Sequence, residues 1–257
     1  MGRSLIVQIY EIQDPWEAEK CLELGVDHVG SVLLDRDEWK VPVIRQVVEV
    51  VQSGGAKSSL IPLFSDFQLI AAALDYYQPD FVHFCEALTT EAGGMIDFSP
   101  FLEVQEAVKA RFPGLGIIRS IPVPPPARAK RFPTLEVAHQ FEELTDIFLT
   151  DTALGNEPID GFIGITGLLP DLDLAQELVK HSSIPVILAG GLSPENVFDA
   201  LVKVGPSGAD SCTRTNRLDG QGNPIRFQKD FEKVKRFVQE VRRAEKVLAS
   251  VGNLGGS

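Results

Sequence analysis

The chain has 257 residues, 44% of them hydrophobic, and its formal net charge is −12. This length suits one large domain or two small ones. The negative charge argues against nucleic acid and anionic membranes as partners, because the overall field repels both. An anionic ligand would therefore have to be held by local positive groups.

The cysteines and the apolar runs indicate the compartment. Cys21, Cys85 and Cys212 are widely spaced, which favours a reduced chain over a disulfide framework or a zinc site. No stretch approaches 18 apolar residues, and the first apolar run is too short for a signal peptide. We expect a soluble, cytoplasmic protein that uses no metal or other cofactor.

In the first half of the chain, short apolar runs alternate with amphipathic segments, as in βα units around a parallel sheet. The runs expected as strands are Ser4–Tyr10, His28–Leu34, Ser58–Phe64 and Phe81–Cys85. The segments expected as helices are Pro15–Leu24, the run from Pro42 that Gly54 closes, Gln68–Tyr77 and Pro100–Arg111. Asp14 and Asp66 precede two of these helices, where aspartate is a preferred cap.

The second half continues the alternation. Its expected strands are Leu115–Ile121, Asp146–Asp151, Ile184–Ala189 and Ala209–Thr213. Its expected helices are Leu135–Glu143, Asp173–Lys180, Glu195–Val202 and the long terminal Phe227–Leu248. Eight strands and eight helices in strict alternation predict a single (β/α)8 TIM barrel over residues 1–257, rather than a doubly wound sheet. A flexible tail is expected from about Val251.

Two loops stand out. The proline-rich segment Ile121–Pro133 carries Arg128 and leaves the fifth strand, so it is either a semi-rigid surface loop or a basic flap over an anion. The stretch IPVILAGGLSPENV ends a buried strand in Gly190 and Gly191, with Ser193 as a cap for the next helix. Bare amides and a helix start at a strand's carboxyl end predict a phosphate site. The alternative is a glycine turn that only joins strand to helix.

Several of these motifs resemble the phosphoribosylanthranilate isomerases of tryptophan biosynthesis. LAGGLSPENV is similar to their seventh-strand phosphate loop, and FLTDT is similar to their sixth-strand LLDT, which places Asp151 on the general acid. GITG, ending at Gly167, resembles a following glycine-rich segment, and VQIYEIQDPWEAEKCLELGVDHVG resembles the family's first βα unit. The resemblance implies a TIM-barrel isomerase that takes a small phosphorylated substrate.

The chain departs from the family pattern at the catalytic base. The family's cysteine at the end of the first strand is replaced by Tyr10, and the glycine after it by Glu11. A tyrosine with a pKa near 10 is a poor base at neutral pH. The arginine after the second strand, which in the family would hold the anthranilate carboxylate, falls near Trp39, with Arg36 and Lys40 as neighbours.

Two further segments also differ from the family. The fourth-strand QLHG becomes HFCE, which includes His83, and DVSSG after the last strand becomes DSCTR, which contains Thr213 and Arg214. The charge of Arg214 could itself bind phosphate. Arg119, on the fifth strand, is expected inside the barrel beside an anion, either Asp151 or a substrate phosphate.

These residues suggest acid–base chemistry. Asp151 is the candidate acid, and Glu11, His83, Cys85 and Tyr10 are the candidate bases. His83 and Cys85 alternate along one strand and so share a face. The remaining histidines, His28, His139 and His181, are expected to be solvated.

The first hypothesis is an isomerase that acts on a small phosphorylated sugar-type substrate in a reaction other than the standard tryptophan-pathway step. A second is a catalytically inactive barrel that binds a ligand or a protein partner. A third is a metal-dependent lyase or hydrolase that uses His83, Cys85 and Asp151. The amphipathic helices are compatible with a homodimer.

Overall fold

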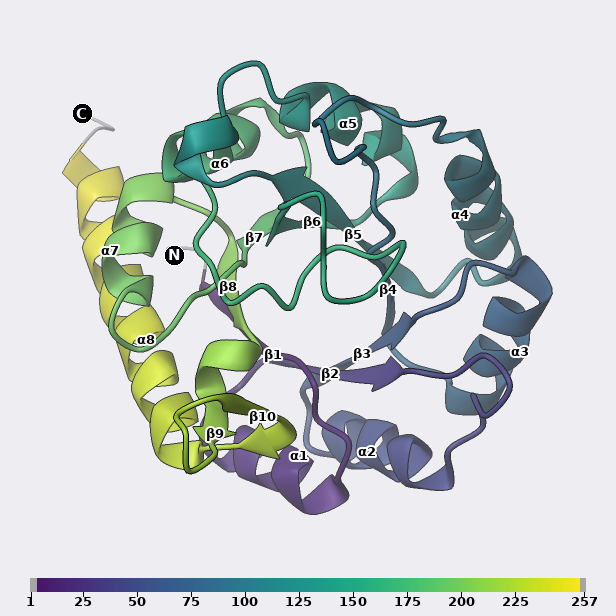
Figure 1. The fold of residues 1–257 in the computed structure, drawn as a ribbon. Coiled ribbons are helices and arrows are strands. Elements are labelled where there is room, and N and C mark those ends of the chain that lie inside the picture. The colour runs from purple at the N-terminus through teal and green to yellow at the C-terminus, as the bar shows by residue number, and fades with distance from the viewer. Residues whose placement is uncertain (1–3, 255–257) are drawn as a thin grey trace.

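The computed structural model describes residues 4–254. Within this range, eight parallel strands form a closed barrel in the order β1 to β8, with the helices as an outer ring (Figure 1). This arrangement confirms the predicted TIM-barrel fold. The strands are β1 (Ile6–Ile9), β2 (His28–Leu33), β3 (Lys57–Pro62), β4 (Phe81–Phe84), β5 (Gly116–Val123), β6 (Ile147–Thr152), β7 (Val186–Leu188) and β8 (Gly208–Ser211).

The helices of the ring begin where the sequence places side-chain caps. Asp14, Asp66 and Asp171 each accept a hydrogen bond from a backbone amide in the first turn of the helix that follows, which satisfies an otherwise unpaired donor. The helices are α1 (Pro15–Glu23), α2 (Pro42–Ser53), α3 (Phe67–Tyr77), α4 (Ser99–Arg111), α5 (Thr134–Phe141), α6 (Leu172–His181), α7 (Val197–Val204) and α8 (Phe231–Leu254).

The barrel interior contains an apolar cluster and a row of buried polar side chains. Gln8 on β1 lies between His28 of β2 and Asp210 of β8 in the strand register, and its amide group contacts both side chains at 3.2 Å. His28 is buried at the start of its strand, so the expectation that it is solvated is wrong. Burial lowers its pKa to about 4, which leaves it neutral at neutral pH.

Between β8 and α8 the chain forms a hairpin of β9 (Asn216–Leu218) and β10 (Pro224–Lys229), which lies beside α1 in Figure 1. The predicted terminal helix from Phe227 is therefore wrong at its start, and the alternation is not strict. Phe227 adopts a φ of 60°, which a helix excludes, and Asp230 caps α8 through the amides of Glu232 and Lys233.

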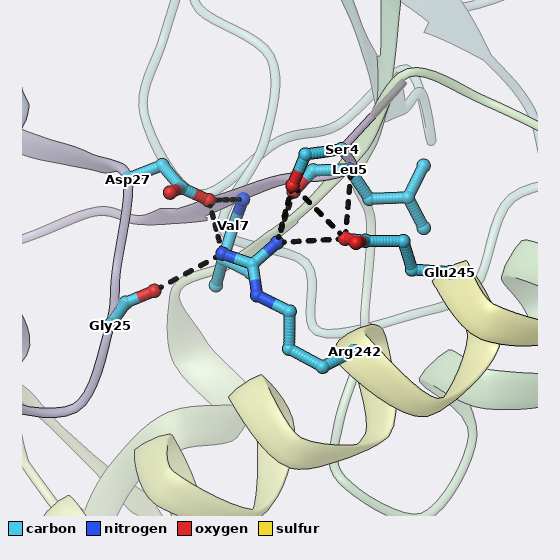
Figure 2. A network of polar contacts seen from close by, with 7 residues as sticks. All are labelled: Ser4, Leu5, Val7, Gly25, Asp27, Arg242 and Glu245. Carbon is cyan, nitrogen blue, oxygen red and sulfur yellow. Dashed lines mark hydrogen bonds and ion pairs between the residues drawn. The ribbon is translucent and has the colours of Figure 1, made fainter. Parts of the chain in front are cut away.

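The long helix α8 is fixed to the amino-terminal end of the barrel (Figure 2). Arg242 donates hydrogen bonds to the carbonyl of Leu5 at 2.5 Å and to the carboxylate of Asp27 at 2.7 Å. Glu245 accepts a bond from the amide of Leu5 at 3.0 Å and pairs with Arg242. These bonds connect the last helix to the strand on which the barrel closes.

The end of α8 bears on the expected tail. Helix α8 continues to Leu254, so residues 251–254, where the flexible tail was expected to begin, are helical. Residues 255–257 lie outside the described part of the chain. Across the described residues, no helix has both the length and the apolar character needed to span a membrane.

Candidate functional site

A pocket that is partly open to solvent lies at the carboxyl ends of the strands. It is lined by the ends of the strands, by residues 159, 162–167 of the loop between β6 and α6, and by Arg226 of β10. In Figure 1 that loop crosses in front of the barrel opening. This face is where TIM barrels hold small ligands.

Asp151, at the end of β6, faces this pocket. Its Oδ1 accepts a hydrogen bond from the amide of Thr152 at 2.8 Å, while Gly164 approaches so closely that a Cβ there would lie 2.5 Å from Oδ2. Burial raises the pKa of Asp151 to about 7, and the charge of nearby Glu157 adds to the rise. A carboxyl group with this pKa can donate or accept a proton at neutral pH.

Asp210 is a second carboxyl group in the same pocket, and the sequence analysis did not select it. Burial raises its pKa to about 7, and the charge of Asp151 contributes to the rise. The signal that could have found it is side-chain alternation, because Asp210 of β8 lies two residues before Cys212, which follows the strand, and both line the pocket.

Tyr10 and His83 line the pocket, but their polar atoms already take part in a buried hydrogen-bond network. The Tyr10 hydroxyl lies 2.6 Å from Ser59 Oγ and 2.7 Å from His83 Nδ1, and His83 Nε2 lies 2.8 Å from Ser120 Oγ. Burial raises the pKa of Tyr10 well above its usual value and lowers that of His83 to about 3. Both side chains are therefore neutral, and neither is free to act as a base.

The proposed metal site is not assembled in the described part of the chain. Residues 4–254 contain no group of three or more His, Cys, Asp or Glu side chains that could hold a metal ion. Both ring nitrogens of His83 already have partners. Burial keeps the pKa of the Cys85 thiol well above its usual value, so this thiol is protonated.

Glu11 also lines the pocket, in an unusual conformation. Its φ is 64°, in the left-handed region where non-glycine residues are uncommon, and only 2% of its surface is exposed. Arg226 Nε donates a hydrogen bond to Glu11 Oε1 at 2.7 Å, whereas Oε2 is buried with no hydrogen-bond partner. Backbone strain and an unpaired buried oxygen are features that concentrate at functional sites.

Gly190 and Gly191 follow β7 with φ values of 96° and 59°. No acceptor within the described residues receives a hydrogen bond from either amide. A Cβ on Gly191 would lie 2.5 Å from the carbonyl carbon of Leu168, so only glycine allows the neighbouring loop to pack here. Both glycines line the pocket and leave their amides available for an anion.

Three further predicted residues, Gly167, Thr213 and Arg214, line the pocket, and the carbonyl oxygen of Gly167 would lie 2.8 Å from a Cβ on Gly191. Arg214 donates from Nε and Nη2 to the carbonyl oxygen of Gly167, at 2.9 and 2.6 Å. Its guanidinium group is therefore partly committed to the loop between β6 and α6, and it brings one positive charge beside the glycines.

Two predicted site residues do not reach the pocket. Ser193 Oγ accepts a hydrogen bond from the amide of Glu195, and the Ser193 amide donates to Asn196 Oδ1, so Ser193 stabilises the turn before α7. Arg119 was expected inside the barrel. It alternates with the inward-facing Ser120 and so points outward, where it pairs with Glu86.

The surroundings of Arg119 explain this position. Its guanidinium carbon lies 4.4 Å from the ring centroid of Phe141 in α5 and 5.8 Å from that of Phe101 in α4. Arg119 thus contributes to packing between the barrel and its helices, not to ligand binding.

No protein-family model matches the chain. Among curated proteins, an N-(5'-phosphoribosyl)anthranilate isomerase of Methanosarcina mazei is 34% identical over 149 residues, which cover 58% of this chain and 57% of that protein. One of Methanosarcina acetivorans is 33% identical over 128 residues, covering 49% and 50%. The chain thus spans about half the length of these curated relatives. One of Methanothrix thermoacetophila is 29% identical over 254 residues, covering 93% and 99%.

Solved structures share the fold. The phosphoribosylanthranilate isomerase of Thermotoga maritima aligns with a TM-score of 0.66 and 20% identity, covering 93% of this chain and 99% of that one. Another such isomerase, solved with reduced 1-(o-carboxyphenylamino)-1-deoxyribulose 5-phosphate, aligns with a TM-score of 0.64 and 17% identity, with the same coverage. A third structure is that of monomers generated from the dimeric phosphoribosylanthranilate isomerase of Thermotoga maritima. The chain is thus similar in sequence to curated N-(5'-phosphoribosyl)anthranilate isomerases and shares its fold with solved structures of such enzymes.

Proposed function

We propose that this protein is an isomerase that converts an aminated pentose phosphate into the corresponding 1-amino-1-deoxyketose phosphate. One observation carries the proposal: a carboxyl group with a pKa of about 7, Asp151, lines the same pocket as the uncommitted amides of Gly190 and Gly191. The pocket thus offers an anion site and a proton donor within one small-molecule volume.

The rearrangement needs an acid and a base. Asp151 donates a proton to the ring oxygen of the sugar, which opens the ring and leaves an iminium ion between C1 and the amine. A base then removes the proton from C2, and the resulting enamine tautomerises to the ketone. No oxidant or reductant is needed, because C1 is reduced as C2 is oxidised.

Glu11 is our choice for the base. Glu11 lines the pocket, and its buried Oε2 has no hydrogen-bond partner, so the lone pairs of this oxygen are not committed within the protein. Tyr10 and His83, the other candidates, are neutral and hydrogen-bonded to each other. This assignment moves the base one residue along the chain from the position where the family has its cysteine.

The phosphate is held on the glycine side of the pocket. The amides of Gly190 and Gly191 donate to its oxygens, and Arg214 and Thr213 lie beside them. The chain's net charge of −12 makes this local positive group necessary for attracting an anion.

The relatives are named for N-(5'-phosphoribosyl)anthranilate. Because Tyr10 replaces the cysteine and cannot perform its role, we propose that the natural substrate is a different aminated pentose phosphate. The named compound remains the first one to test, since it belongs to the same chemical class.

The test is a product assay by NMR with N-(5'-phosphoribosyl)anthranilate and with pentose 5-phosphates carrying other amines. We expect turnover of at least one of them, and losses of about 10²- to 10⁴-fold in kcat for Asp151→Asn and for Glu11→Gln. Asp173→Asn, on the exposed face of α6, is the matched control and should be unaffected. If no aminated pentose phosphate reacts but one still binds, the inactive ligand-binding hypothesis is correct instead.

A further inference from the structure

The loop between β6 and α6, which crosses in front of the barrel opening in Figure 1, is bonded to the end of β4. Residues 85–87 lie antiparallel to residues 161–163 of this loop, with Glu86 opposite Phe162. Two backbone hydrogen bonds join these segments, from the amide of Ala87 to the carbonyl of Gly161 at 2.8 Å and from the amide of Ile163 to the carbonyl of Cys85 at 2.9 Å. The position of residues 161–164, the roof segment, therefore depends on the position of residues 85–87.

The Glu86 side chain lies in the wall of the barrel and is not part of the pocket lining. Only 4% of it is exposed. One carboxylate oxygen pairs with Nη1 of Arg119 on β5, and the other accepts a hydrogen bond at 3.3 Å from Ser65 Oγ in the loop after β3. A buried carboxylate needs such partners, so this side chain is held between the two strands next to its own.

Arg119 is fixed in its turn by the helix layer. Only 1% of its side chain is exposed, and its guanidinium carbon lies 5.9 Å from the ring centroid of Phe84, in addition to its contacts with α4 and α5. Its Nε and Nη2 have no hydrogen-bond partner among the described residues. Because a buried guanidinium group strongly needs an anion, the pair with Glu86 resists displacement.

This ion pair is a feature of the chain's own sequence. Glu86 is the last residue of HFCE, whereas the motif QLHG that this segment resembles ends in glycine. A glycine has no side chain that reaches Arg119. The anchored end of β4 therefore does not follow from the resemblance.

The roof segment lies against Asp151. A Cβ on Gly164 would lie 2.5 Å from Asp151 Oδ2, and the φ of Gly164 is 112°, so glycine is required at this close approach. The preceding residue, Ile163, is 5% exposed and also lines the pocket. The roof segment thus excludes water from the carboxyl group, and burial is the main cause of the raised pKa of Asp151.

The other groups that face Asp151 do not stabilise its ionised form. Glu157 lies in the same loop, Asp210 lies on β8, and Cys85 follows β4. Two of these groups are acidic and the third is a protonated thiol, so none of them carries a positive charge. The residue beside Asp151 on β5 is Pro122, which is uncharged. The protonation of Asp151 therefore depends on how well the roof segment covers it.

We propose that Glu86 and Arg119 are positioning residues, whose ion pair fixes the end of β4 and thereby holds the roof segment against Asp151. Neither side chain lines the pocket, so both act through the backbone of residues 85–87. This inference rests on the proposed function in taking Asp151 as the acid. Without the pair, the roof segment separates from Asp151 and water reaches the carboxyl group, which then ionises at a lower pH.

The test uses the double variant Glu86→Leu/Arg119→Met, which puts apolar side chains in place of the pair and leaves no buried charge without a partner. NMR titration of the aspartate carboxyl signals measures the pKa of Asp151, whose signal is the one missing from Asp151→Asn. We expect this pKa to fall from about 7 by about one pH unit. Hydrogen exchange at the amides of Ala87 and Ile163 should become about 10- to 100-fold faster. Neither measurement needs turnover.

A milder variant and two controls accompany the double variant. Glu86→Gln keeps the size of the side chain but removes its charge, and it should change both measurements in the same direction by less. Arg111→Met breaks an exposed pair with Asp75 and should leave both measurements as in the wild type. Arg242→Met, at the other end of the barrel, controls for a general loss of stability and should leave the pKa of Asp151 unchanged.

The inference is overturned if the folded double variant keeps the wild-type pKa of Asp151 or the wild-type exchange rates. If the double variant does not fold, the same results in Glu86→Gln overturn it. A fall of this pKa in Arg242→Met of the same size would also refute it, because the pair would then act only through overall stability. A lowered pKa in a protein without turnover refutes only the proposed function, whereas turnover with an unchanged pKa in the double variant refutes only the inference.

Discussion

Asp151 and Asp210 show how burial changes the protonation of single residues. Each carboxyl group has its pKa raised from an ordinary value of 3.8 to about 7, first by burial. The charge of Asp151 also raises the pKa of Asp210. Catalytic groups often carry such shifts, and the folded state loses stability when these groups ionise.

These raised pKa values predict a pH dependence of stability. A carboxyl group whose pKa is higher in the folded than in the unfolded state stabilises the fold fully below about pH 4, and the contribution is lost as the pH rises through about 7. We expect the Tm to fall between pH 5 and pH 8. In Asp151→Asn that fall should be smaller by about 2–4 °C, the effect of about 1 kcal/mol in a domain of this size.

Differential scanning calorimetry at the two pH values measures the change. Asp173→Asn, which alters an exposed carboxylate, should leave the fall in Tm as it is in the wild type. An Asp151→Asn protein with the full wild-type fall would show that Asp151 is not protonated preferentially in the folded state.

The βα units could be predicted from the sequence, because their signals are local. Apolar runs of strand length, aspartate caps and closing glycines each act within one turn or strand, and the structure places the predicted strands close to their expected positions. The β9–β10 hairpin was missed because the helical pattern was extended backward through Phe227. The turn sequence between Asp219 and Pro224 was the available signal against that extension.

The candidate site could be predicted only in part. Asp151 and the two glycines follow recognisable strands, so their place at the barrel mouth follows from the chain itself. The pair of Glu11 and Arg226 joins residues 215 positions apart, which no local pattern reveals. The prediction that Arg119 lies inside the barrel was wrong for a different reason. A shift of one residue along a strand turns a side chain from the interior to the helix layer.

Lys229 gives a prediction at the level of the hairpin. Its ammonium group is buried and bonded to Cys212 and Asn216, so Lys229→Met leaves a carbonyl and an amide oxygen without their donor. We expect a loss of about 2–3 kcal/mol in the free energy of unfolding and faster proteolysis between β9 and β10. Urea unfolding and limited proteolysis measure these effects, and Lys235→Met, at an exposed position of α8, should change neither. An unchanged cleavage rate would mean that Lys229 does not anchor the hairpin.

In the whole molecule, the pocket and the contacts that fix α8 lie at opposite ends of the barrel. The pocket is formed at the carboxyl ends of the strands, whereas α8 is fixed to the amino ends by Arg242 (Figure 2). In TIM barrels this separation allows the loops at one end to change while the other end maintains stability. The hairpin follows this rule, because it lies between β8 and α8 and contributes Arg226 to the pocket.

Arg242→Met therefore should weaken the fold without weakening the site. The change removes hydrogen bonds to Leu5 and Asp27 and breaks the ion pair with Glu245, at a position where 30% of the arginine side chain is exposed. Discounted for solvent, the expected loss is about 1–3 kcal/mol in the free energy of unfolding by urea. Arg236, also on α8, forms an exposed pair with Glu195 in the turn before α7, and Arg236→Met should cost less than about 0.5 kcal/mol. Affinity for reduced 1-(o-carboxyphenylamino)-1-deoxyribulose 5-phosphate should be unchanged in both variants, and a weaker affinity in Arg242→Met alone would show that the two ends of the barrel are coupled.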